Sequence, residues 1–269
     1  MSVALLVNGD PLGQVSAADR GLHYGDGLFE TIACRDGRAR RVALHLARLG
    51  RGCDRLGITP PPAAALQEEI ARLARGEAAC LLKLIVTRGV ARGRGYRPAG
   101  DETATRILAR HPWPAAPGRG WHAGLSTVRL GENARLAGIK HLNRLEQVLA
   151  QRERPEALDE VLMLAGHDEV ISGSMSNLFI VEGERLVTPP IERCGVEGVM
   201  RRVVLETATR AGWRASVEPV SLMRLRTART AFLTNARLGV QPLASLEGRP
   251  LEADARIGAL AATIDAQTD

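Results

Sequence analysis

The sequence has few aromatic residues, lysines and cysteines, and it lacks a long apolar run. No stretch approaches the ~20 apolar residues that cross a membrane. The apolar run Val3–Val7 is short and has no basic residues before it, so we expect neither a membrane protein nor a signal peptide. The four cysteines are irregularly spaced, which predicts buried free thiols rather than disulfides. We therefore expect a cytoplasmic protein.

Motifs for metal ions and nucleic acids are also missing. Neither an HExxH motif nor a CxxC pair occurs, so we expect no metal site. The chain carries 36 basic and 30 acidic residues, a net charge of +6, but the two signs are interleaved and aromatic residues make up only 3%. Nucleic-acid binding needs clustered positive charge and stacking surfaces, so we expect no nucleic-acid partner.

What is present is the composition of an ordinary globular protein. The 269 residues are 45% hydrophobic and 25% charged, which is typical of soluble domains. Prolines 112, 114 and 117 are clustered, and proline interrupts helices and strands. We therefore predict an interdomain linker over residues 112–120. It would separate a small N-terminal α+β domain, residues 1–111, from a larger C-terminal α/β domain, residues 121–269.

Hydrophobic spacing predicts alternating strands and helices in both halves of the chain. The predicted helices include residues 44–56, 142–152 and 199–211, and the predicted strands include residues 79–87 and 125–129. An Asn-Gly-Asp turn predicts a hairpin over residues 3–15. No G-x-G-x-x-G motif follows a strand, which gives a dinucleotide fold little support. The mixed pattern favours an α/β fold of two α+β-like domains over one doubly wound parallel sheet.

Lysine occurs only twice, and all other basic residues are arginines. Chemistry that needs a primary amine therefore has two candidates. Lys83 lies inside an apolar strand and is expected to be an edge or surface residue. Lys140 follows Gly138 at a predicted transition from loop to helix. A lysine taken alone is usually a solvated surface charge, so its neighbours must decide.

Several segments resemble the fold-type IV pyridoxal-phosphate (PLP) enzymes. This family includes branched-chain and D-amino-acid aminotransferases and 4-amino-4-deoxychorismate lyases. The similar segments are residues 24–31 (YGDGLFET), 45–49 (HLARL) and 173–179 (GSMSNLF). The resemblance covers nearly the whole chain and implies a two-domain fold like that of D-amino-acid aminotransferases. Residues 138–148 (GIKHLNRLEQV) are more similar to the lyases than to the aminotransferases.

The resemblance implies a PLP site, position by position. Lys140 would hold the cofactor as its Schiff-base lysine, because lysine can lose its proton and attack an aldehyde whereas arginine cannot. Arg48 would bind the cofactor phosphate. The other cofactor contacts would be Ser172, Val196, Val199, Met200, Asn235 and Ala236, with the backbone amides of residues 199 and 200 at a helix start. A helix N-terminus and a guanidinium both suit a dianionic phosphate.

The similarity to the lyases implies an activity in folate biosynthesis. The substrate would be 4-amino-4-deoxychorismate and the products 4-aminobenzoate and pyruvate, with Lys140 as general base and acid. An aminotransferase for D- or branched-chain amino acids is the alternative. The predicted substrate contacts are Phe29, Arg94, Tyr96 and Arg106. The loop 88–96 is either such a contact, a solvated turn, or a segment that reaches a partner subunit in the homodimer that the family implies.

One position departs from the family pattern. Where the family places a glutamate against the pyridine nitrogen, this chain has Ser172. A carboxylate keeps that nitrogen protonated, whereas a hydroxyl only shares a hydrogen bond. Glu169 would point to the opposite face of a regular strand, so only a bulge or a shifted register would bring it there. We expect the weaker electron sink to impair transamination more than an elimination that forms an aromatic ring.

Overall fold

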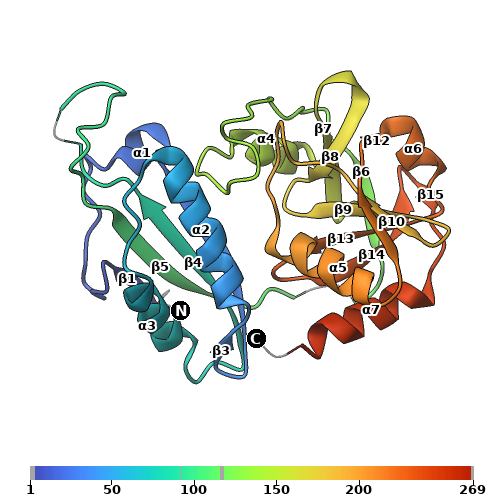
Figure 1. Cartoon of the computed structure of the whole chain (residues 1–269), viewed down its shortest axis with the longest axis horizontal. Helices are drawn as coiled ribbons and strands as arrows, with labels where there is room; N and C mark the ends of the chain where they lie inside the picture. Colours follow the sequence, from blue (N-terminus) through green and yellow to red (C-terminus); the bar gives the residue numbers. More distant parts are fainter. Residues whose placement is uncertain (1–3, 92, 116–117, 268–269) are drawn as a thin grey trace. The chain divides into compact units, whose positions relative to one another are not determined.

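The computed structural model describes residues 4–91, 93–115 and 118–267, which form two compact units (Figure 1). The first unit takes the described residues up to Ala115 and the segment Ile139–Asn143. The second takes the described residues up to Gly138 and from Arg144 onward. The boundary falls inside the predicted linker 112–120, of which residues 116–117 lie outside the described residues, as do the chain ends 1–3 and 268–269 of the two predicted domains.

The first unit is a five-stranded antiparallel sheet in the order β1-β5-β4-β2-β3. Helix α2 packs on β2, and α3 packs on β3, β4 and β5; Figure 1 shows both helices, in blue and teal, against this sheet. The elements are β1 (Leu5–Val7), α1 (Arg20–Tyr24), β2 (Gly27–Arg35), β3 (Arg38–Ala39), α2 (Val42–Leu56), α3 (Ala63–Ala74), β4 (Ala79–Thr87) and β5 (Thr105–Pro112).

The central strand β4 alternates between a buried face and a more open face. Leu82, Leu84 and Val86 are fully buried, whereas Lys83 is exposed. This period of two confirms the strand predicted from the apolar run. Lys83 is a surface residue, as expected, but β4 lies between β5 and β2 and is not an edge strand.

The N-terminal hairpin forms only in part. Strand β1 pairs with β5, with Leu5 opposite Ala109. Beyond the turn, Val7 and Asp10 exchange both backbone hydrogen bonds, and Gly13 N donates to Asp10 O. These tight turns replace an extended ladder, so the predicted second strand up to Val15 is wrong.

The second unit is a ten-stranded mixed sheet in the order β11-β10-β9-β13-β14-β6-β7-β8-β12, with β15 beside β14. Strand β8 also pairs with β9, so the strands from β9 through β13, β14, β6 and β7 to β8 close into a ring. The strands are β6 (Trp121–Leu125), β7 (Glu160–Leu164), β8 (Glu169–Gly173), β9 (Asn177–Glu182), β10 (Arg185–Thr188), β11 (Arg214–Val217), β12 (Val220–Ser221), β13 (Thr230–Asn235), β14 (Gly239–Leu246) and β15 (Arg249–Pro250). The helices are α4 (Leu145–Glu153), α5 (Val199–Arg210), α6 (Leu222–Thr227) and α7 (Ala255–Asp265), with a short 3-10 helix η1 (Gly166–Asp168).

Two hydrophobic clusters form the core of the second unit. The larger one joins side chains of β6, β7, β9, β13 and β14, among them Trp121 and Ala123. The smaller one includes Met163, Ile171 and Ala150 of α4. The strand predicted over residues 125–129 begins four residues earlier, as β6. Trp121 and Ala123 are the side chains that it buries in this core. Helices α5 and α7 pack on each other, and on β13 and β14 respectively.

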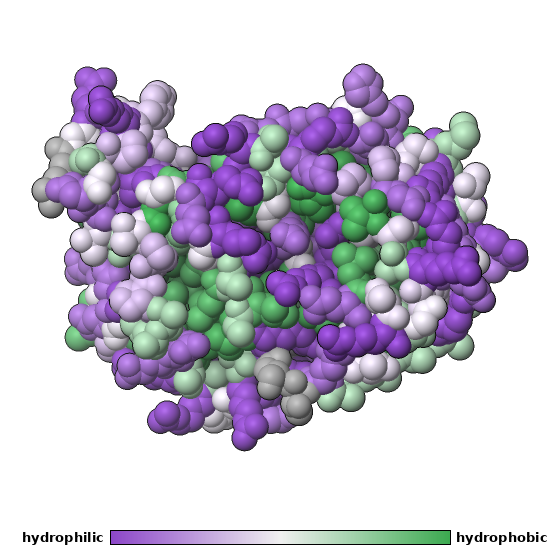
Figure 2. Space-filling model, viewed as in Figure 1, coloured by the Kyte–Doolittle hydropathy of each residue, from purple (hydrophilic) through white to green (hydrophobic). Residues whose placement is uncertain are grey.

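All four cysteines are buried and free, as predicted. Cys34 and Cys80 lie directly opposite each other on β2 and β4, and burial raises the pKa of the Cys34 thiol. Hydrophilic side chains cover much of the face shown in Figure 2, with hydrophobic areas between them. None of the described helices is long and apolar enough to cross a membrane. Nor do the described His, Cys, Asp and Glu side chains form a group of three or more that could hold a metal ion.

Helix α2 contains two glycines in different surroundings, which gives a test of its packing. A Cβ on Gly52 would lie 2.7 Å from Leu28 Cδ2, whereas a Cβ on Gly50 would meet nothing within 4 Å. We expect Gly52→Ala to lower the free energy of unfolding by about 1–3 kcal/mol, because Leu28 must shift within a packed core. Gly50→Ala should raise it by about 0.5–1 kcal/mol through helix propensity. Urea unfolding of both variants measures this, and equal effects would contradict the packing of α2 on β2.

Candidate active site

Lys140 is held by main-chain hydrogen bonds to the edge of β2. Phe29 N donates to Lys140 O (2.9 Å), and Leu142 N donates to Gly27 O (3.0 Å). Leu28 and His141 form an antiparallel bridge between these bonds. The lysine segment therefore belongs to the first unit, not to the C-terminal part of the chain as predicted.

The Phe29 ring lies near both lysines of the chain. Lys140 Nζ is 4.3 Å from the ring centroid and Lys83 Nζ is 5.6 Å from it. An ammonium over an aromatic face gains about 0.5–2 kcal/mol. Lys83 lies opposite Thr31 on the neighbouring strand, so the side chains of both lysines are on the Phe29 face of β2. Phe29 is thus a wall beside the predicted catalytic amine.

A buried ion pair orients Arg48 on the other face of β2. Glu30 is 1% exposed, and it accepts hydrogen bonds from Arg48 Nε (2.8 Å), from Arg48 Nη2 and from His45 Nδ1 (2.6 Å). Burial alone would raise the pKa of Glu30. The charge of Arg48 and the hydrogen bonds from both partners outweigh burial and lower this pKa to about 2. The Glu30 carboxylate therefore fixes the predicted phosphate-binding guanidinium in one orientation.

In the second unit, several of the predicted cofactor residues lie near one end of the strands that form the closed ring. Ser172 on β8 lies opposite Asn177 on β9, and Asn177 lies opposite Thr234 on β13, the residue before Asn235. Asn177 Nδ2 donates to Val196 O (2.9 Å). Ser172, Val196 and Asn235 are thus brought together by strand register and one side-chain hydrogen bond.

The start of helix α5 lies against the same end of these strands, close to Asn177. Its N-cap is Gly198, which provides no side-chain cap for the first helical amides. A Cβ on Gly198 would lie 2.0 Å from Asn177 Oδ1, so a larger residue here would displace the Asn177 side chain. The backbone amides of Val199 and Met200 form the uncapped positive end of a helix, which is a suitable site for a phosphate.

The loop after β13 is a compact turn. Asn235 Oδ1 accepts from Arg237 N (3.0 Å) and Leu238 N (2.9 Å), and Asn235 Nδ2 donates to Met175 O (3.1 Å). The Asn235 side chain therefore shapes the turn and ties it to the segment that joins β8 and β9. Only the backbone of Asn235 and Ala236 remains for the predicted cofactor contact.

Two carboxylates near Ser172 already have partners. Strand β8 contains an irregularity, because Met163 pairs with Ser172 but Leu164 pairs with Val170. Glu169 nevertheless forms an ion pair with Arg193. Its carboxylate is therefore engaged there and does not replace the missing glutamate at position 172.

The second carboxylate is Glu160 at the start of β7, which sequence reasoning missed. It is fully buried and accepts six hydrogen bonds from five residues. The donors are Gln151, Val161, Ser174, Met175 and Ser176. Glu160 thereby shapes the turn between Ser172 and Asn177. The sequence signal was an acidic residue directly before an apolar strand, which must find partners when it is buried.

The predicted substrate residues differ in their surroundings. Arg94 is exposed and, within the described chain, makes no hydrogen bond or ion pair. Tyr96 is 84% exposed. Arg106 instead donates to Glu69 Oε1 (2.7 Å) and to Asn8 O (2.9 Å). Arg106 is thus already paired with Glu69, so a substrate carboxylate would have to compete for it.

The buried Glu30 ion pair gives a pH-dependent prediction. The pKa of Glu30 is lowered to about 2 in the fold, below the ordinary value of about 4.3. The pair therefore stabilises the fold above pH 4.3, and this stability is lost as the pH falls toward 2. We expect Glu30→Gln to lower the free energy of unfolding by about 3–5 kcal/mol at pH 7, and the difference from the wild type should shrink between pH 5 and pH 3.

Urea unfolding at pH 7, 5 and 3 measures this difference. Glu68→Gln on the exposed face of α3 is the control, and it should leave the stability unchanged at each pH. A Glu30→Gln deficit that does not depend on pH would show that the carboxylate is not charged in the fold.

Comparison with known proteins places this geometry in a family. A profile of the class IV aminotransferase family matches residues 27–246. An aminodeoxychorismate lyase from Vibrio harveyi is 34% identical over 260 residues, which cover 94% of this chain and 95% of that one. A crystal structure of 4-amino-4-deoxychorismate lyase from Pseudomonas aeruginosa has a TM-score of 0.92 and 41% identity, covering 98% of this chain and 99% of that one. A putative branched-chain-amino-acid aminotransferase from Methanocaldococcus jannaschii is 32% identical over 88% of this chain and 84% of its own length. The chain therefore belongs to the class IV aminotransferase family.

Proposed function

We propose that this protein is a PLP-dependent lyase that converts 4-amino-4-deoxychorismate into 4-aminobenzoate and pyruvate. The observation that carries the proposal is full-length similarity to two proteins with that name, at 34% and 41% identity. The resemblance of residues 138–148 to the lyases of the family supports the same activity.

The residues of the chain fit PLP. Lys140 is one of only two primary amines on side chains, and an aldehyde cofactor needs such an amine. The uncapped amides of Val199 and Met200 suit a dianionic phosphate, and Arg48 offers a guanidinium held in place by Glu30. We assign Ser172 to the ring nitrogen and Val196, Asn235 and Ala236 to the remaining cofactor contacts.

In this reaction the main task of the protein is to move one proton and to orient two bonds. PLP bound through the substrate amine would supply a sink for the electron pair that is left when the proton is removed from the ring carbon. Lys140 removes the proton from the ring carbon that bears the amine. The bond from the neighbouring carbon to the enolpyruvyl oxygen then breaks, and Lys140 returns a proton to the departing group, which leaves as pyruvate. The ring becomes aromatic, so no oxidant or keto acid is consumed.

The substrate carries carboxylates and a ring, and the first unit offers arginines for the carboxylates and aromatic side chains for the ring. Arg94 is the preferred partner, with Arg106 second because of its ion pair with Glu69. Phe29 and Tyr96 supply the apolar contacts. We further propose a homodimer, in line with the resemblance, and a location in the cytoplasm, where four buried free cysteines would stay reduced.

An aminotransferase is the second candidate, because a putative branched-chain-amino-acid aminotransferase is 32% identical. The two activities differ in one requirement. A lyase releases pyruvate and 4-aminobenzoate from aminodeoxychorismate without a keto acid, whereas an aminotransferase stops after one turnover unless a keto acid is added. Pyruvate release by the purified protein with PLP alone therefore tests the proposal.

The two lysines give a matched pair of variants for this assay. We expect Lys140→Ala to lower kcat by at least about 10³-fold, because it removes the general base. Lys83→Ala should stay within about twofold of the wild type. Borohydride reduction followed by peptide mapping should place the PLP label on Lys140 in the wild type and in Lys83→Ala.

Two results would contradict the proposal. A PLP label on Lys83 would show that Lys140 is not the Schiff-base lysine. A protein that stays colourless with PLP would show that it does not bind the cofactor.

Ser172 allows a test of how the pyridine nitrogen is used. We expect Ser172→Glu to raise the rate of transamination with D-alanine more than the rate of pyruvate release, because a carboxylate keeps the nitrogen protonated. Pyridoxamine phosphate formation and pyruvate release are measured side by side. Ser172→Ala is the control and should lower both rates only modestly. If neither rate changes in Ser172→Glu, the role assigned to this position is wrong.

A further inference from the structure

An exposed loop in the first unit is tied down by one buried arginine. Residues 93–100 are exposed, whereas Arg20 on α1 is 4% exposed. Arg20 Nη1 donates to Gly95 O (3.2 Å), and Nη2 donates to Tyr96 O (2.7 Å). A single guanidinium therefore holds two consecutive carbonyl groups of the loop, in a forked geometry that only arginine provides.

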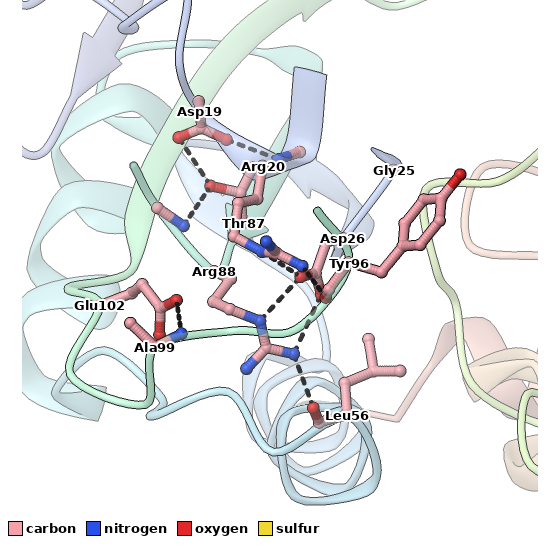
Figure 3. Close-up of polar contacts among 12 residues, drawn as sticks. Asp19, Arg20, Gly25, Asp26, Leu56, Thr87, Arg88, Tyr96, Ala99 and Glu102 are labelled. Carbon is pink, nitrogen blue, oxygen red and sulfur yellow. Dashed lines mark hydrogen bonds and ion pairs between the residues drawn. The ribbon is translucent and has the colours of Figure 1, made fainter. Parts of the chain in front are cut away.

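The anchor of Arg20 is itself rigid. Arg20 Nε donates to Asp26 Oδ2 (2.8 Å), and Arg88 donates to the same carboxylate through Nε (2.7 Å) and Nη2 (3.1 Å). Arg88 also donates to Leu56 O (2.7 Å) and Gly57 O (2.6 Å) at the end of α2. Figure 3 shows Asp26 between the two guanidinium groups.

Charge keeps this anchor in place near neutral pH. Burial would raise the pKa of Asp26, but the hydrogen bonds and charges of Arg88 and Arg20 outweigh it and lower this pKa. Asp26 therefore stays ionised and links the loop to the helix that carries Arg48.

Further contacts fix the conformation of the loop. The Tyr96 ring meets the Tyr24 ring edge-on at 5.4 Å, and the Arg20 guanidinium lies 4.9 Å from the centroid of Tyr24. Glu102 accepts from Ala99 N (2.6 Å) and Gly100 N (2.9 Å). The loop is thus an ordered platform, although its side chains are exposed.

Arg94 lies next to the anchored carbonyl groups and has no anionic partner among the described residues. An exposed arginine on a mobile loop would lose much conformational freedom when it binds an anion, which weakens binding. Fixing the backbone of residues 95 and 96 removes part of that cost before the substrate arrives.

We propose that Arg20 is a positioning residue for the substrate: it clamps residues 95 and 96 so that Arg94 and Tyr96 are presented in one conformation to a substrate carboxylate. This inference rests on the proposed function. Arg20 itself touches backbone and Asp26, not the reacting atoms.

Arg20→Lys is the first test, because lysine keeps the charge opposite Asp26 but cannot also reach both carbonyl groups. Limited trypsin digestion reports on the loop directly. Cleavage of the Arg94–Gly95 bond requires release of the Gly95 carbonyl from Arg20, and the following arginine precedes Pro98, where trypsin does not cut. We expect peptide mapping to show cleavage after Arg94 about tenfold faster in Arg20→Lys, since cleavage follows the open population.

Steady-state kinetics separate positioning from a general loss of structure. We expect KM for aminodeoxychorismate to rise about tenfold, the effect of losing one charge-assisted hydrogen bond, with kcat within twofold. The visible spectrum with PLP and the thermal unfolding midpoint should stay unchanged. Arg20→Ala is the second variant and should show the faster cleavage and the higher KM more strongly. Arg72→Ala is the matched control, because Arg72 also donates to a carbonyl of this unit, Gly9 O (3.3 Å), but does not contact the loop.

Two outcomes overturn the inference. Unchanged cleavage in both Arg20 variants would show that Arg20 does not hold the loop. Faster cleavage with an unchanged KM would show that the loop does not serve the substrate. A wild-type protein that releases no pyruvate would instead contradict the proposed function, and the clamp would then be decided by the cleavage rates alone.

Discussion

The main-chain pairing of residues 139–143 with β2 is the constraint on which the first unit's part of the candidate site depends. The hydrogen bonds from Phe29 N to Lys140 O and from Leu142 N to Gly27 O fix the lysine backbone without using its amine. The position of Lys140 therefore does not depend on what the amine binds. The same strand directs Phe29 toward Lys140 and Glu30 toward Arg48 on its opposite face. One strand thus sets the surroundings of the amine and the orientation of the predicted phosphate ligand.

Two buried carboxylates, Glu30 and Glu160, and the partly buried Asp26 provide a second level of organisation. Glu30, Asp26 and Glu160 each accept several hydrogen bonds from segments distant in sequence. Removing an ionised carboxylate from water costs several kcal/mol, and only multiple donors offset that cost. Such a group is satisfied in one arrangement of its donors, so it selects a conformation. Glu30 fixes the orientation of Arg48. Asp26 holds Arg20, which contacts the loop of residues 93–100, and Glu160 shapes the turn that follows Ser172.

Much of this organisation could be predicted from the sequence, and the limits have physical causes. The strand 79–87 and the helix 44–56 follow from local hydrophobic periodicity, and both are present. Local periodicity does not reveal which strand a segment pairs with. It therefore missed that β1 pairs with β5 rather than with a hairpin partner, and that the Lys140 segment joins the first unit. It also did not reveal the contacts of Arg20 with Tyr96 and of Asp26 with Arg88, because these partners are more than 60 residues away in the chain.

The surroundings of Ser172 bear on which reaction the fold supports. Within the second unit, Glu169 is paired with Arg193, and both oxygens of Glu160 are occupied by donors. Neither of these two carboxylates is therefore available to replace a glutamate at position 172, which offers a hydroxyl. Transamination needs the cofactor to hold the substrate electrons until a proton returns at another carbon. In the elimination the electrons leave with the enolpyruvyl group, and formation of the aromatic ring makes this step irreversible. If Ser172 faces the ring nitrogen as we propose, an electron sink of lower capacity is a smaller handicap for a lyase than for an aminotransferase.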